Sequence, residues 1–149
     1  MATVSFYSVT NGDVERTVAR LLEKVYQAGH RIVLWAETDE KLEFFNSVLW
    51  TFSSAAFVPH GTKEDGFTAD QPILLTTTIE NPNEANVLVL VDPYEISDFG
   101  KFQRCLDLFN AHDELMQTLA LERMKAYKKA GHEVLHWVQD PTGKWEKQN

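Results

Sequence analysis

The sequence has few of the features that hold small secreted proteins together. It contains one cysteine, Cys105, so no internal disulfide can form, which suits a reducing cytoplasm. Glycine and proline are scarce, with 7 and 5 residues in a chain of 149. Together with 44% hydrophobic residues, this composition is typical of a globular fold and argues against disorder. We expect one domain, residues 1–149, with its own core.

Long hydrophobic runs and excess positive charge are missing too. No apolar stretch reaches the roughly 20 residues that a membrane-spanning helix needs, and no secretion signal opens the chain. We therefore expect a soluble cytoplasmic protein. Lysine and arginine total 14 against 22 acidic residues, a net charge of −8. A molecule of this charge repels phosphate, which argues against a broad nucleic-acid-binding face.

Hydrophobic periodicity predicts strands and helices in alternation. We expect strands at residues 4–8, 31–36, 73–77, 87–91 and 134–138. We expect helices at residues 14–28, 39–50, 99–110 and 113–131. The nearly all-apolar runs indicate strands covered on both faces, so the sequence predicts a three-layer α/β domain with a mostly parallel central sheet and helices on both faces. Residues from about 140 to 149 are interpreted as a turn and a polar C-terminal tail.

The segment 113–131 is the clearest helix, and it carries a local cluster of positive charge. Asp113 and Glu114 begin it, where the helix dipole favours acidic side chains, and Gly131 suits its end. Its last turns contain Arg123, Lys125, Lys128 and Lys129. Two interpretations remain open. The charges either match the dipole and nothing more, or they form, with Tyr127, a surface for an acidic partner.

The sequence His132-Glu133-Val134-Leu135-His136 matches the motif H-E-x-x-H. On a helix the two histidines could hold zinc, with the glutamate as base, so a zinc-dependent hydrolase is the alternative function. However, Gly131 ends the helix before the motif, and residues 134–138 have the composition of a strand. In a strand the imidazoles would lie roughly 13 Å apart, too far to share one ion.

Residues 87–92 resemble the second motif of phosphate-loop NTPases, four or more apolar residues and then an aspartate. The phosphate-binding sequence G-x-x-x-x-G-K-[ST] is absent, and so is a G-x-G-x-x-G motif after the first strand. Asp92 is then expected to support the turn at Pro93, and a nucleotide-binding regulator is only a third possibility. Cys105, in an apolar segment, is expected to be a buried side chain and not a nucleophile. We expect no cofactor and no metal.

Aromatic side chains gather after the second expected helix. Trp50, Phe52 and Phe57 lie near one another in the sequence, beside Pro59. Such a patch suits a protein interface, in which aromatic residues serve as anchors. The same residues could equally pack beneath the loop, and the sequence pattern leaves both possibilities open.

Several short segments together resemble the chi subunit family of bacterial DNA polymerase III. They occur in order along most of the chain as Ser5-Phe6-Tyr7, Leu49-Trp50, Phe57-Val58-Pro59-His60, Gln71-Pro72-Ile73, the apolar strand to Asp92, and Glu122-Arg123 with Lys125-Ala126-Tyr127 and Gly131. The resemblance implies a Rossmann-like fold and a non-catalytic accessory subunit of the DNA polymerase III holoenzyme. Family members pair with the psi subunit, which tethers them to the clamp loader, and they bind the acidic C-terminal tail of single-stranded DNA-binding protein.

The resemblance also implies two binding sites. Phe57 matches the family's psi-contacting phenylalanine by position, and we place Trp50, Val58 and Pro59 beside it. The tail site is expected on the basic helix, at Arg123, Lys125, Tyr127, Lys128 and Lys129. The family commonly has Ala-Arg-x-Arg followed by an aromatic residue in this helix. This sequence departs from that pattern at two positions, with Leu121 in place of an arginine and Met124 in place of the aromatic residue. Tail binding is therefore expected to be weaker, to shift toward Lys128 and Lys129, or to involve another partner.

Overall fold

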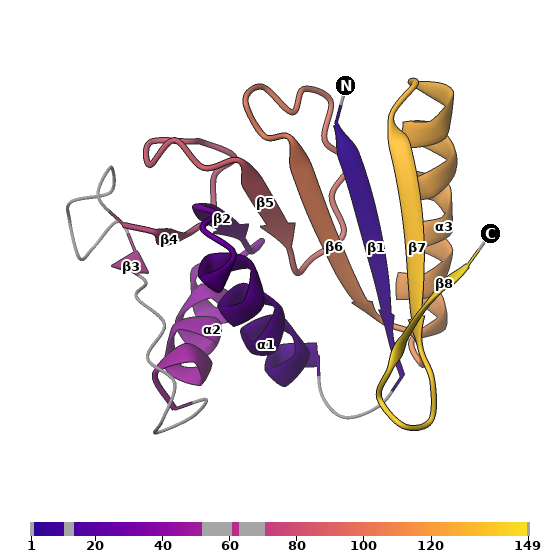
Figure 1. The fold of residues 1–149 in the computed structure, drawn as a ribbon, viewed down its shortest axis with the longest axis horizontal. Coiled ribbons are helices and arrows are strands. Elements are labelled where there is room, and N and C mark those ends of the chain that lie inside the picture. Colours follow the sequence, from indigo (N-terminus) through magenta and orange to yellow (C-terminus); the bar gives the residue numbers. More distant parts are fainter. Residues whose placement is uncertain (1, 11–13, 52–60, 63–70, 149) are drawn as a thin grey trace.

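The structure is a computed structural model that describes residues 2–10, 14–51, 61–62 and 71–148, without the side chain of Trp50. Three helices and eight strands occur among these residues (Figure 1). The helices are α1 (Val14–Gln27), α2 (Asp39–Thr51) and α3 (Glu114–Lys129). The strands are β1 (Thr3–Val9), β2 (Ile32–Trp35), β3 (Gly61–Thr62), β4 (Ile73–Thr76), β5 (Val87–Leu90), β6 (Arg104–Asn110), β7 (Glu133–Gln139) and β8 (Trp145–Gln148).

The strands form a single sheet in the order β3-β4-β2-β5-β6-β1-β7-β8. Every neighbouring pair is parallel except β7 and β8, which are antiparallel. Helices cover both faces. α1 and α2 pack on one face through Val18, Leu22 and Phe45, and α3 packs on the other through Ala120, Met124 and Tyr127. The predicted three-layer α/β fold with a mostly parallel sheet is confirmed.

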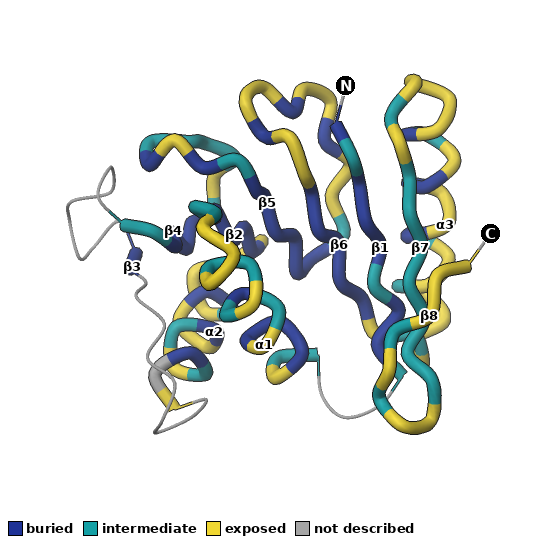
Figure 2. Tube along the Cα trace, viewed as in Figure 1, coloured by how far each residue is buried: buried dark blue, intermediate teal, exposed yellow. Residues whose placement is uncertain are grey.

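The central strands explain the all-apolar runs in the sequence. In β2, Ile32 and Leu34 face α1 and α2, while Val33 and Trp35 face the side of α3. Because successive side chains of a strand point to opposite faces, a strand buried on both sides needs an apolar residue at every position. Figure 2 shows the middle of the sheet as its most continuously buried part.

The predicted helix over residues 99–110 is wrong, because residues 104–110 form strand β6 between β5 and β1. Leu106 and Leu108 face the α1 side, and Cys105 and Phe109 face the α3 side. Asp107 interrupts this apolar run, and in the sequence it resembles a residue on the polar side of a helix. In the structure it is only 1% exposed. The expected burial of Cys105 is confirmed, at 0% exposure.

The residues interpreted as a polar C-terminal tail contain strand β8, which pairs with β7 at the edge of the sheet. The expected turn before it is present. The carboxylate Oδ1 of Asp140 accepts hydrogen bonds from Thr142 N at 2.9 Å, Thr142 Oγ1 at 2.6 Å and Lys144 N at 2.9 Å. These bonds are the main reason that the pKa of Asp140 is lowered. Gly143 has a φ of +90°, which favours glycine.

Candidate partner-binding surfaces

Helix α3 begins and ends where the sequence predicts. Asp113 is its N-cap, and its Oδ1 accepts a hydrogen bond from Met116 N at 3.1 Å. Gly131, just beyond the other end, has a φ of +93°. The buried side of the helix consists of Ala120, Arg123, Met124 and Tyr127, at the three- to four-residue spacing of one helical face. On the outer side, Leu121 is 45% exposed.

Arg123 is buried against the sheet in an ion pair with Asp107. Its Nε donates to Oδ2 and its Nη2 to Oδ1, both at 2.9 Å. The two side chains are 6% and 1% exposed, and the guanidinium lies 5.8 Å from the centre of the Phe6 ring. Burial raises the pKa of Asp107 to about 6, and the hydrogen bonds and charge of Arg123 only partly oppose it. The arginine thus fastens α3 to β6.

Tyr127 is buried as well, at 2% exposure. Its hydroxyl accepts a hydrogen bond from Ile96 N at 2.8 Å, and its ring lies 6.1 Å from that of Phe6 and 5.5 Å from that of Phe99. Burial raises the pKa of this phenol. Tyr127 therefore joins α3 to the segment between β5 and β6, and its hydroxyl faces the core.

The three lysines predicted for the tail site remain exposed. Lys125, Lys128 and Lys129 lie in the last turns of α3, and none forms an ion pair within the described part of the chain. Lys128 is close enough to β7 to help burial lower the pKa of His136. Of the five predicted residues, the structure gathers the lysines on one surface and turns Arg123 inward together with Tyr127.

The predicted psi-binding residues fall outside what the structure describes. Phe57, Val58 and Pro59 are not among the described residues. Trp50 belongs to the last turn of α2, and its side chain is not described. This group therefore stays a prediction from the sequence.

Four of the five H-E-x-x-H residues lie on a strand, as expected. Glu133 to Gln139 form β7, and His132 immediately precedes it. His132 Nδ1 accepts a hydrogen bond from Ala2 N at 3.1 Å, whereas His136 Nε2 and Ser8 Oγ are hydrogen-bonded at 2.6 Å. The described residues contain no group of three or more histidine, cysteine or acidic side chains that could hold a metal ion.

A cleft of about 440 Å³ lies at the carboxyl ends of β2, β5 and β6. Ligands often bind at this edge of parallel sheets. Asp92 lies here as a strand-end residue. It accepts a hydrogen bond from Glu37 N at 2.8 Å and forms an ion pair with Lys41. Glu15, Glu37 and Asp113 also line the cleft, together with the two cations Lys41 and Arg123, both of which are paired with aspartates. Carboxylates therefore outnumber cations in the cleft, which opposes phosphate binding.

The model of the family described as "DNA polymerase III chi subunit, HolC" matches residues 1–135. The chain belongs to this family. The chi resemblance noted in the sequence is therefore confirmed. No helix among the described residues is long and apolar enough to cross a membrane.

Three chi subunits illustrate the similarity. The "Probable DNA polymerase III subunit chi" of Rickettsia prowazekii is 32% identical over 152 aligned residues, which cover 99% of this chain and 92% of that protein. The "DNA polymerase III subunit chi" of Escherichia coli is 24% identical over 139 residues, covering 88% of this chain and 94% of the relative. The "DNA polymerase III subunit chi" of Pseudomonas aeruginosa is 23% identical over 135 residues, which cover 89% of this chain and 93% of that protein.

Two features of this chi-family protein escaped prediction from the sequence. The ion pair between Asp107 and Arg123 joins residues on different elements, and the aspartate looked like part of a helix. The hairpin of β7 and β8 reaches past residue 135, where the match to the chi family model ends. Its signal was present in the turn residues at 140–143, but the polar composition of residues 144–148 concealed the second strand.

Proposed function

We propose that this protein is a non-catalytic accessory subunit of the bacterial replicative DNA polymerase III holoenzyme. In the clamp-loader complex, it links the psi subunit to the acidic C-terminal tail of single-stranded DNA-binding protein. The proposal rests on membership of the chi family. The observation that supports a tail site is the group of exposed lysines on the outer side of α3, none of which forms an ion pair with another described residue.

The outer side of α3 offers both parts of a tail-binding surface. Lys125 and Lys128 follow Leu121 by four and seven residues, so the three side chains lie on one stripe of the helix. The ammonium groups would bind the tail's carboxylates, and the exposed Leu121 would contact its terminal apolar side chain. Leu121 thus supplies apolar area where the family pattern has an arginine.

Arg123 has a different role in this proposal. Its guanidinium donors point to Asp107, and 6% of its side chain is exposed. It therefore acts as a positioning residue that holds α3, with its lysines, on the sheet. Tyr127 acts in the same way through Ile96.

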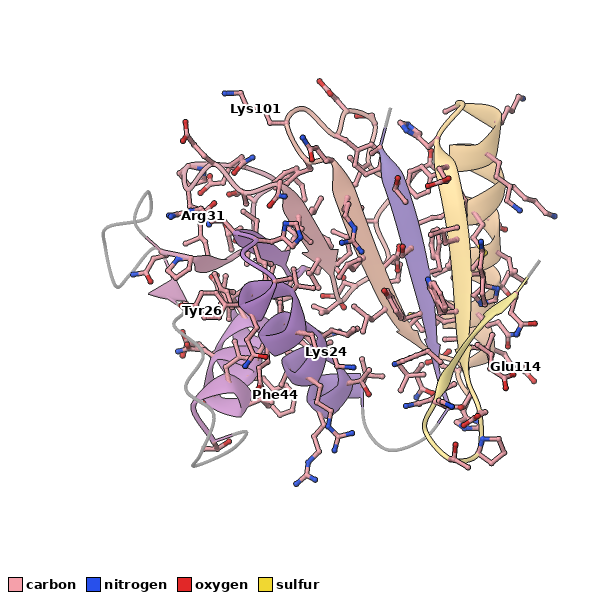
Figure 3. The ribbon with its side chains drawn as sticks, in the orientation of Figure 1. Lys24, Tyr26, Arg31, Phe44, Lys101 and Glu114 are labelled. Carbon is pink, nitrogen blue, oxygen red and sulfur yellow. The ribbon has the colours of Figure 1, made fainter. Side chains whose placement is uncertain are left out.

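The tail site can be tested by fluorescence anisotropy with a labelled peptide that copies the acidic tail. Reversing a charge about 4 Å from a carboxylate changes the interaction by about 2 kcal/mol in water, and salt reduces this. We therefore expect Lys128→Glu to weaken binding about tenfold. Lys101→Glu is the matched control, because it changes the net charge equally from an exposed loop position (Figure 3). Equal effects of the two changes, or binding independent of salt, would contradict the assignment.

The psi contact needs a separate test. Co-expression of the chain with psi should yield a stable complex that the change Phe57→Ala disrupts, since aromatic anchors carry much of an interface's binding energy. Far-UV circular dichroism of the variant controls for the fold. Retention of psi by a folded Phe57→Ala variant would refute this part of the proposal.

A further inference from the structure

A groove of about 580 Å³ separates α1 from the hairpin of β7 and β8. Arg20 and Lys24 line it from the helix, and Lys144 lines it from the hairpin. All three side chains are exposed, and none forms an ion pair within the described residues. Lys24 lies on the side of α1 nearer to the C-terminal strands (Figure 3). The groove therefore concentrates positive charge on a protein whose net charge is −8.

The groove also has apolar parts. Trp145 opposes Gln139 in the β7–β8 register, and both residues line the groove. The Trp145 ring stands edge-on to that of Tyr7, at 5.1 Å and 84°, which holds the indole in place. Leu21 of α1, half-buried, contributes from the opposite wall. An apolar side chain of a ligand could thus insert between Leu21 and Trp145.

The hairpin wall is well ordered by its turn. Besides the three bonds to its carboxylate, Asp140 donates its backbone N–H to Lys144 O at 2.8 Å, and its own carbonyl accepts from Gly143 N at 2.9 Å. These bonds fix the backbone that carries Lys144 and Trp145. The groove is therefore preformed, which lowers the entropy lost when a ligand binds.

The charge balance favours a short acidic peptide over a nucleic acid. Three cations line the groove against one carboxylate, that of Glu23. A short peptide feels charges within the Debye length, about 8 Å at physiological salt, and so meets a positive local field. A longer polyanion would also meet the negative charge of the remaining molecule.

We propose that this groove binds an acidic segment of a partner protein that carries an aliphatic or aromatic side chain. The carboxylates would pair with Arg20, Lys24 and Lys144, and the apolar side chain would pack between Leu21 and Trp145. The groove is formed by α1, whereas α3 packs on the other face of the sheet, so this site is separate from the proposed tail site. Its hairpin wall lies beyond the residues that match the chi family model.

The test uses a short fluorescein-labelled peptide of alternating aspartate and leucine, and anisotropy at low salt. All measurements are made in a Lys128→Glu background, which weakens the proposed tail site on α3 by the tenfold expected above, so that its contribution is reduced equally in every variant. Adding Lys24→Glu should weaken binding about tenfold, since a reversed charge acts at close range. Adding Lys101→Glu, the matched exposed control, should change it less than about twofold, because salt screens distant charges. Trp145→Ala should also weaken binding, with the melting temperature recorded for every variant.

Three outcomes would overturn the proposal. Equal weakening by Lys24→Glu and Lys101→Glu would mean that the peptide responds only to net charge. Tighter binding of a single-stranded oligonucleotide, lost in Lys24→Glu, would assign the groove to nucleic acid. Self-association by sedimentation that Lys24→Glu abolishes would assign it to a second copy of the chain. Loss of tail-peptide binding in Lys128→Glu alone concerns only the α3 site and leaves this test unaffected.

Discussion

Removing the guanidinium of Arg123 should leave Asp107 as an unpaired carboxyl in the core. Arg123→Met keeps the length and the helix propensity of the side chain. An isolated buried carboxylate is so costly that the group takes up a proton instead. Burial already raises the pKa of Asp107 to about 6 although the arginine opposes this, so without the arginine the pKa should rise further. The variant's stability should therefore depend on pH in a way that the wild type's does not.

The size and sign of this effect follow from the pKa values. A carboxyl whose pKa is raised in the folded state contributes stability that is fully present below its unfolded value, 3.8, and is lost as pH rises through the folded value. In the wild type this loss ends near pH 6. In Arg123→Met the loss continues above pH 6, at about 1.4 kcal/mol per pH unit, until the pH passes the higher pKa of the variant. Breaking the buried pair should cost about 3–5 kcal/mol at neutral pH and less in acid.

Urea denaturation between about pH 5 and about pH 7.5 measures these free energies of unfolding, through the linear dependence on denaturant. The control is the double variant Asp107→Leu/Arg123→Met, in which the ion pair is replaced by apolar side chains. It should be within about 1 kcal/mol of the wild type or more stable, and should lack the pH dependence of the single variant. A deficit of Arg123→Met that stays constant with pH, or a double variant as unstable as the single one, would refute the reasoning.

Three further predictions concern the same half of the fold. Tyr127→Phe removes the acceptor of Ile96 N and should cost about 1–3 kcal/mol in thermal unfolding, because it leaves a buried donor unpaired; a cost near zero would show that the hydroxyl is dispensable. By NMR titration the pKa of His136 should lie below 6.5, because burial and the charge of Lys128 both lower it, and it should rise in Lys128→Glu; an unchanged pKa in that variant would show that the lysine does not act on the histidine. Cys105 should react with a thiol reagent only on unfolding, because burial raises its pKa and closes access; rapid labelling of the native protein would contradict this.

Most elements could be predicted because their signals are local. The apolar runs of β2 and β5 are visible in the sequence, and so is the capping of α3 by Asp113 and Gly131. The parallel sheet follows from the alternation of strands and helices. The strand after Gly131, which separates the two histidines of the H-E-x-x-H motif, could also be predicted from its composition.

Strand β6 could not be predicted, because it contains a charged residue, Asp107, whose burial depends on a partner far along the chain. Asp107 breaks an apolar run, and sequence patterns treat such a residue as solvent-exposed. In the structure Arg123, sixteen residues later and on another element, satisfies it. Strand β8 was hidden for a related reason, since an edge strand with exposed side chains has no apolar pattern.

The candidate sites divide in the same way. The sequence by itself determined that a basic cluster ends one helix of an acidic α/β protein, and its resemblance to chi subunits sufficed for the family. Only the tertiary structure decided which cations are available to a partner. It buries Arg123 against Asp107 and leaves Lys125 and Lys128 exposed. It also brings α1 beside the β7–β8 hairpin to form a basic groove. Burial and ion pairing depend on residues that are far apart in the chain, and the order of residues in the sequence does not show which of them come together in the fold.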